Sequence, residues 1–174
     1  MKRSVDVFSY AGHICNAMKK GILLTTSAQG KVNTMTIGWG KIGIEWGRPV
    51  FIAYVRESRY TRQLLDESGE FTVNIPLDGI DQKILGYCGS KSGRDHDKIG
   101  EMGLTVVESN AISAPAIREL PLTLECKVIY RQEQNLTAVP SDIIDRFYPE
   151  NGNGFRDYHI AYFGEILDAY LIEE

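Results

Sequence analysis

The segment Arg56–Thr61 carries the residues best suited to bind an anion. The guanidinium groups of Arg56 and Arg59 stand where a strand-like run passes into a helix-like one, together with two aliphatic hydroxyl groups. A helix start attracts anions through its free N–H groups and its positive dipole end, and arginine forks match phosphate oxygens. The spacing therefore indicates a phosphate-type site. It is equally compatible with Ser58 acting only as an N-cap beside solvated arginines.

A second basic segment, residues 91–98, contains Lys91, Arg94 and a glycine before another helix-like run. It can close over the same anion from a different direction. The run Asp95–Asp97 consists of metal-ligand types, but neighbouring residues on a helix do not all face one ion. We therefore favour a capped helix start here and expect no metal site.

The run Asn33–Trp39 alternates polar and apolar residues and has small residues near its aromatic end. Such a strand can offer backbone groups and a flat apolar wall to a planar ligand. A strand of the hydrophobic core shows the same alternation, so both interpretations stay open.

Two apparent motifs lack the context that their chemistry needs. Gly38–Gly43 fits the pattern G-x-G-x-x-G, but Pro49 and the glycine before it oppose the helix that a dinucleotide site requires. Gly89–Ser92 resembles the end of a Walker A loop, yet Leu85 and Ser90 stand where its glycines belong. We expect neither a Rossmann site nor a nucleoside triphosphatase.

No residue pattern supplies a nucleophile. The sequence has no Gly-x-Ser-x-Gly elbow, and His13, His96 and His159 are not spaced for a triad or a metal site. His159 remains a weak catalytic candidate at most. If the chain is an enzyme, we expect a bound cofactor to carry the chemistry.

Composition bounds the class of protein. The chain has 174 residues, 43% hydrophobic and 24% charged, which is typical of one globular domain. A net charge of −4 argues against a nucleic-acid binder, and no run approaches the roughly 18 apolar residues of a membrane span. Cys15, Cys88 and Cys126 are far apart and no apolar leader follows Met1, so we expect free thiols in the cytoplasm.

The strand-like runs outnumber the helix-like ones. Runs rich in β-branched or aromatic residues cover residues 22–27, 34–38, 50–55, 71–75, 104–107, 122–130 and 160–172, the last with a bend near Gly164. Helices are expected over residues 58–67 (stopped by Gly69), 81–85 (stopped by Gly86), 95–102 (stopped by Gly103) and 141–147. This order predicts a mainly β domain, an antiparallel barrel or sandwich with helices at its edge.

Taken together and in this order, these stretches resemble the flavin reductase-like family of FMN-binding split-barrel proteins, especially its flavoredoxin-like branch. The resemblance covers nearly the whole chain, and no single piece of it is specific. It rests on the segments Asn33–Trp39, Gly47–Val50, Val55–Thr61, Glu70–Asn74, Ser92–Lys98 and His159–Glu165.

The resemblance implies a single split-barrel domain over residues 1–174, forming a homodimer with an FMN near each subunit interface. It implies that the strand with Asn33, Met35, Thr36, Gly38 and Trp39 lies along the isoalloxazine ring. The phosphate and ribityl chain would meet Val55, Arg56, Ser58, Arg59, Tyr60 and Thr61. The second basic segment, with Lys91, Ser92, Gly93, Arg94 and Lys98, would also approach the flavin, and His159 would lie near it.

The resemblance further implies an oxidoreductase in which NAD(P)H passes hydride to bound FMN, and electrons then go to free flavin, an iron centre or a protein. A positive group such as Lys98 or Arg94 would favour the reduced flavin. Two alternatives stay open: an electron carrier reduced by a partner protein, and a flavin-binding protein without turnover.

Overall fold

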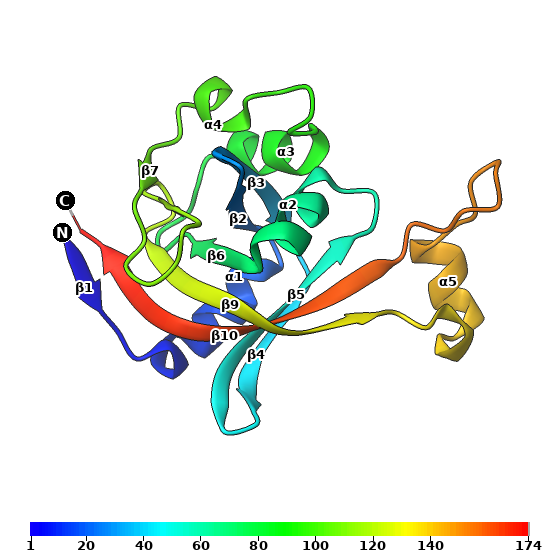
Figure 1. Ribbon diagram of the computed structural model, residues 1–174, viewed down its shortest axis with the longest axis horizontal. Coiled ribbons are helices and arrows are strands. Elements are labelled where there is room, and N and C mark those ends of the chain that lie inside the picture. Colours follow the sequence, from blue (N-terminus) through cyan, green and yellow to red (C-terminus); the bar gives the residue numbers. More distant parts are fainter. Residues whose placement is uncertain (174) are drawn as a thin grey trace.

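The computed structural model describes residues 1–173 and shows one large antiparallel sheet with helices around it (Figure 1). The eight-stranded sheet has the order β3-β2-β6-β9-β10-β5-β4, and β1 also pairs with β10. Its strands are β1 (Lys2–Ser4), β2 (Ile22–Ala28), β3 (Lys31–Ile37), β4 (Gly40–Glu45), β5 (Arg48–Arg56), β6 (Glu70–Ile75), β9 (Leu122–Glu133) and β10 (His159–Ile172). The short strands β7 (Val106–Val107) and β8 (Ala116–Ile117) pair separately. The mainly β class is therefore confirmed.

The helices lie around the sheet and along the connections. They are α1 (Ala11–Met18), α2 (Tyr60–Ser68), α3 (Gln82–Ser90), α4 (Lys98–Glu101) and α5 (Ser141–Phe147), with 3-10 turns at Val7–Tyr10 and Leu136–Ala138. Figure 1 shows β9 and β10 as long curved neighbours that cross the molecule. The segment between them, residues 134–158, carries α5 and extends beyond one end of these strands; it is called the α5 arm below. Within residues 1–173, no helix combines the length and the apolar character needed to cross a bilayer.

Two-residue turns join the hairpins β2–β3 and β4–β5. The residues of both turns have positive φ: 51° and 73° at Gln29 and Gly30, and 50° and 71° at Trp46 and Gly47. This backbone matches the right-handed twist of the flanking strands. The second hairpin also shows that the glycines of Gly38–Gly43 do not precede a helix, because β4 leads into a turn and a strand. The segment therefore lacks the helix that a dinucleotide site requires.

Apolar side chains pack on both sides of the sheet. The main cluster lies inside the curved sheet and includes the fully buried Phe51, Phe71 and Tyr162. A second cluster, between α3 and the outer face of β2, contains Leu23, Leu85 and Cys88 among others. β2 is therefore buried on both faces, which explains its continuous apolar run.

Several predicted element boundaries are wrong, for identifiable reasons. α3 continues through Gly86 to Ser90, because Leu85 and Cys88 anchor it in the second cluster. The helix expected over residues 95–102 shrinks to α4, and helix α1 and strand β4 were not predicted. β4 has the weakly strand-forming sequence GKIGIE, and its pairing with β5 decides its conformation.

Gly164 marks the bend predicted for the last strand. The register of β10 against β9 shifts between Phe163 and Gly164, so a bulge curves the strand at this point. A Cβ atom on Gly164 would lie 2.5 Å from Cζ of Phe71 and 2.8 Å from Cβ of Cys126. The core therefore approaches this backbone too closely for any side chain.

We expect Gly164→Ala to lower the free energy of unfolding by about 1–3 kcal/mol through overpacking, as measured by urea denaturation. The matched control is Gly43→Ala, in another strand, where an added Cβ meets no heavy atom within 4 Å. Equal stability of the two variants would contradict the close packing at Gly164.

Candidate functional site

Two adjoining pockets contain nearly all of the residues predicted to bind a ligand. The first, here called the cationic pocket, has a volume of about 90 Å³ and is lined by Asn33, Met35, Ser58, Arg59, Tyr60, Thr61, Cys88, Lys91, Ser92, Gly93, Arg94 and Lys98. The second, the Trp39 pocket, has about 180 Å³ and is lined by Met35, Thr36, Ile37, Gly38, Trp39, Tyr54, Arg56, Arg59 and His159. Met35 and Arg59 line both pockets, so the two adjoin at these residues.

The N-terminus of α2 opens into the cationic pocket. Its N-cap, Arg59, is extended and makes no side-chain capping bond, and no acceptor within residues 1–173 meets the N–H groups of Tyr60 and Thr61. The predicted capping role of Ser58 is wrong. Its N–H and hydroxyl groups instead donate to the carboxylate of Asp157, at 3.0 and 2.7 Å. The helix start therefore keeps free donors for a ligand.

No carboxylate lines the cationic pocket to balance its positive charge. Arg59, Lys91, Arg94 and Lys98 line it. Among the residues that the structure describes, none of these four side chains forms an ion pair. The guanidinium of Arg94 stacks over the ring of Tyr60, with its carbon 5.3 Å from the ring centroid. The pocket is thus complementary to an anion.

Lys98 is the most deeply placed of these cations, at 4% exposed. Its Nζ donates to the carbonyl oxygen of Cys88 at 3.2 Å. Burial, with a smaller contribution from the nearby Arg59, lowers the pKa of Lys98 to about 8. A bound anion would oppose both effects and favour the protonated amine.

Asn33 and Gly93 hold the walls of the cationic pocket together. The Asn33 amide, on β3, donates to Oγ1 of Thr61 on α2 at 2.7 Å, and both residues are buried. A Cβ atom on Gly93 would lie 2.1 Å from Oδ1 of Asn33 and 3.0 Å from the Tyr60 ring. Glycine is therefore required where the second basic segment meets β3 and α2.

Arg56 and Val55, both expected to meet the phosphate and ribityl chain, make other contacts in the structure. The guanidinium of Arg56 donates to the carbonyl oxygens of Asp157 at 2.6 Å and Phe147 at 3.0 Å, so it fastens the arm that carries α5. It also lines the Trp39 pocket, although its two terminal nitrogens already donate to these main-chain oxygens. Val55 is fully buried in the main core, and its side chain lines neither pocket.

His159 and Trp39 form the wall of the Trp39 pocket next to the arm. Their rings lie 4.7 Å apart between centroids, and the ring of Phe147 contacts Trp39 at 5.2 Å. Nδ1 of His159 is 2.8 Å from the Tyr148 hydroxyl. Burial lowers the pKa of His159 to about 4, with a further contribution from Arg56, so its imidazole is neutral near pH 7. Tyr148, Phe147 and Asp157 lacked any sequence signal, because only the folded arm brings them here.

The segment Asp95–Asp97 leads into α4, with Asp97 as its N-cap. The Asp97 carboxylate accepts from the N–H group of Gly100 at 3.1 Å and caps α4, as predicted. His96 turns toward Glu101, with 3.3 Å between Nδ1 and Oε2.

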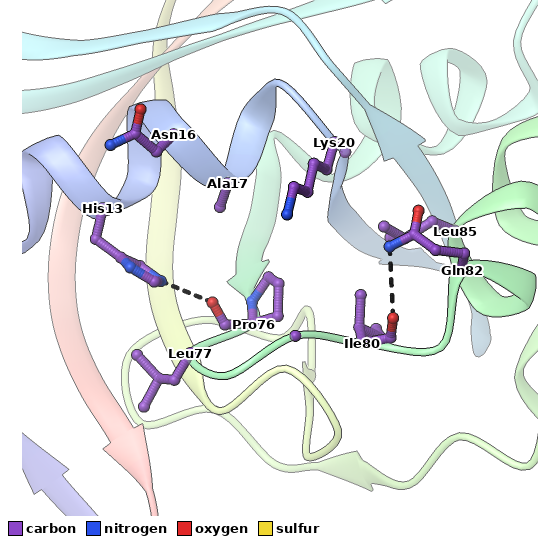
Figure 2. A pocket seen from close by; sticks show the side chains of 11 residues that line it. His13, Asn16, Ala17, Lys20, Pro76, Leu77, Ile80, Gln82 and Leu85 are labelled. Atoms are coloured by element: carbon purple, nitrogen blue, oxygen red, sulfur yellow. Dashed lines mark hydrogen bonds between the residues drawn. The ribbon is translucent and has the colours of Figure 1, made fainter.

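Two further hollows are lined mostly by residues outside the predicted set. One, the outer hollow, has about 490 Å³ and is lined by Cys15, Met18, Lys19, Gly38, Trp39, Gly40, Lys41, Tyr54 and Gln134; it adjoins the Trp39 pocket along Trp39 and Tyr54. The other, of about 270 Å³, lies between α1 and the segment before α3 (Figure 2). There His13 Nε2 is 2.7 Å from the Pro76 carbonyl oxygen, and no lining residue is shared with the cationic pocket.

The depressed pKa of His159 predicts a specific loss of stability in acid. The unfolded chain takes up a proton near pH 6.5 and the folded one only near pH 4, so stability falls as pH drops through this window, by about 3 kcal/mol in total. His159→Gln should remove this part of the pH dependence of the unfolding free energy, whereas His13→Gln should keep it. Identical acid profiles for wild type and His159→Gln would contradict the assignment.

The sequence and the fold are both similar to those of known proteins. The chain is 30% identical over 135 residues to an uncharacterised protein of Archaeoglobus fulgidus, covering 77% of this chain and 73% of that protein. Its fold is similar to that of the flavoredoxin from Methanosarcina acetivorans (TM-score 0.67, 30% identity, 88% of this chain and 68% of that one). It is also similar to the flavoredoxin of Desulfovibrio vulgaris Miyazaki F (TM-score 0.66, 25% identity, 88% and 69%).

The fold is confirmed as the split barrel. A solved structure from Shewanella frigidimarina that is described as having a split barrel domain superposes with a TM-score of 0.68, over 98% of this chain and 76% of that one, at 17% identity. The family model of the flavin reductase like domain matches residues 16–174. With that match and this architecture, the chain belongs to the flavin reductase-like family.

Proposed function

We propose that the chain binds FMN, with the phosphate in the cationic pocket and the ring system in the Trp39 pocket. The observation that carries this proposal is the convergence of four cations without carboxylate partners on the free N–H groups of α2. Such a site suits a phosphate dianion. The flavoredoxin structures, at 30% and 25% identity, support the choice of a flavin.

The Trp39 pocket fits a planar ring system. β3 is an edge strand of the sheet, so one side of its backbone has free donors and acceptors along Met35, Thr36 and Ile37. The Trp39 indole, 40% exposed, supplies an apolar surface. When bound, FMN would supply a redox centre that accepts two electrons and can pass them on singly.

The residues of the chain would bind and orient this group rather than react themselves. Arg59, at the junction of the two pockets, would hold the phosphate end, together with Lys91 and Lys98. Cys88, whose thiol pKa is raised by burial, would stay protonated beside Lys98.

We propose NAD(P)H as the electron donor. The outer hollow next to Trp39 has room for a second planar molecule, and Lys19 and Lys41 give it positive charge. The alternative is an electron carrier that a partner protein reduces, and the similarity to two flavoredoxins favours keeping it. Free flavin, an iron centre and a protein are the candidate acceptors.

We also propose that the chain acts as a homodimer in the cytoplasm. At the β4–β5 turn, Ile44 is 72% and Trp46 63% exposed, and Trp46 contacts the exposed Tyr130 edge-on at 6.0 Å. A second copy would cover this apolar surface. Sedimentation as a monomer at micromolar concentration would reject the dimer.

The proposal of a cytoplasmic protein is supported by the cysteines. Cys15, Cys88 and Cys126 are all free thiols, which is typical of proteins in a reducing compartment.

Lys98 provides a test of the cationic pocket. Because its pKa in the free protein is about 8, FMN affinity should fall about tenfold as pH rises from about 7 to about 9, where the phosphate stays a dianion. Lys98→Met should weaken binding at pH 7 by a similar factor and flatten the pH profile. Fluorescence titration of FMN measures both.

The control for this variant is Lys127→Met, which removes an exposed lysine of β9 outside these pockets and should leave the affinity unchanged. An unaltered pH profile in Lys98→Met would show that Lys98 does not meet the phosphate.

The choice of donor is tested by mixing the protein with FMN, desalting it, and adding NADH or NADPH without oxygen. We expect retained flavin whose visible absorbance bleaches promptly with one of the two. Retained flavin that stays oxidised would favour the protein-fed carrier, and loss of all flavin on desalting, followed by no saturable titration, would reject FMN binding.

A further inference from the structure

Gln134, Tyr148 and His159 form a hydrogen-bonded chain at the base of the α5 arm. The amide oxygen of Gln134 lies 3.1 Å from the backbone nitrogen of His159 and 2.7 Å from the Tyr148 hydroxyl. The same hydroxyl lies 2.8 Å from Nδ1 of His159. Tyr148 and His159 are buried, so water does not replace these partners.

The donors and acceptors of these three residues allow only one arrangement of their protons. A backbone N–H can only donate, so the Gln134 atom that it meets must be the amide oxygen. That oxygen can only accept, so the Tyr148 hydroxyl gives it its single proton. The phenol oxygen is then an acceptor toward His159, and Nδ1 must carry the imidazole proton.

The other ring nitrogen is consequently an unprotonated acceptor. Nε2 of His159 has no hydrogen-bond partner within residues 1–173, and it is not among the fully buried polar atoms that lack one. It therefore has access to the Trp39 pocket, which His159 lines. The charged groups that face the imidazole are Arg56, which opposes a second proton, Asp157, which favours it less strongly, and Arg59, whose opposing effect is the smallest of the three.

We propose that His159 accepts a hydrogen bond through Nε2 from an O–H or N–H group of the ligand in the Trp39 pocket, and that Gln134 and Tyr148 are positioning residues that hold it in this tautomer. The ligand half rests on the proposed binding of a flavin, which offers both kinds of donor. In this state His159 orients the ligand and has no proton at Nε2 to give to it.

The tautomer is directly measurable without any ligand. In long-range ¹H–¹⁵N correlation spectra of the full chain with ¹⁵N-labelled histidine, His159 should show a protonated Nδ1 and a bare Nε2. His159→Gln identifies its signals among those of the three histidines. A proton on Nε2 in the wild type would overturn the proposal, whether or not FMN binds.

The positioning role is tested with two substitutions at one site. Gln134→Leu removes the acceptor of the Tyr148 proton, which then turns to Nδ1 and moves the imidazole proton to Nε2. We expect that tautomer in the spectrum and FMN binding about tenfold weaker. Gln134→Glu still accepts from both donors, so it should keep the wild-type tautomer and most of the affinity. Gln132→Leu, at an exposed position of β9 two residues before Gln134, should change neither.

Tyr148→Phe extends the test if Gln134→Leu folds poorly. It leaves the Nδ1 proton without an acceptor, and we expect a mixture of tautomers and weakened FMN binding with an intact near-ultraviolet circular dichroism spectrum. Equal affinities for Gln134→Leu and Gln134→Glu would overturn the positioning role. A wild type with the expected tautomer but no FMN binding would overturn the ligand half together with the proposed function, and leave the tautomer established.

Discussion

Lys98 is buried beside Arg59, and within residues 1–173 no carboxylate pairs with either of them. Burying a cation without an anion costs stability, and the lowered pKa of Lys98 is the expression of that cost. The fold nevertheless holds the amine in place through the carbonyl oxygen of Cys88. A site that keeps unpaired cations next to free helix N–H groups is arranged for an anionic ligand that supplies the missing charge.

The walls around this charge depend on close contacts between segments distant in sequence. The amide of Asn33 joins β3 to α2 through Thr61, and Gly93 lets the second basic segment approach both. Thr36 ties β3 to α3 through the carbonyl oxygen of Leu85, at 2.7 Å. Two hydrogen bonds and one close approach at a glycine therefore hold these segments together around the cations.

The α5 arm organises the other half of the site. Arg56, the last residue of β5, and Ser58, just after it, bind Asp157 on the arm. Arg56 donates to its carbonyl oxygen, and Ser58 donates to its carboxylate. This attachment places Phe147 against Trp39 and Tyr148 against His159. The segment that appeared in sequence as a single anion site is thus divided: Arg59 and the helix start face the ligand pocket, whereas Arg56 and Ser58 hold the arm.

Most of the fold was predictable because its signals are local. Strands such as β2, β5 and β6 are short apolar runs bounded by turns, and Gly69 ends α2 in the left-handed conformation that favours glycine (φ 65°). The same local logic failed at Gly86, where packing of Leu85 and Cys88 extends α3, and at β4, which depends on its partner strand.

The amino-acid sequence by itself determined which segments carry charge, aromatic surface and strand or helix propensity, and hence the family and the list of candidate residues. Tertiary structure alone decided which donors remain free, because a guanidinium or hydroxyl is available only if no other part of the chain engages it. Arg56 and Arg59 are identical in type and three positions apart, yet one binds the main chain of the arm and the other lines both pockets. The proton arrangement at His159 is likewise a tertiary property, since Gln134 and Tyr148 meet it only when β9 and the arm fold back against β10.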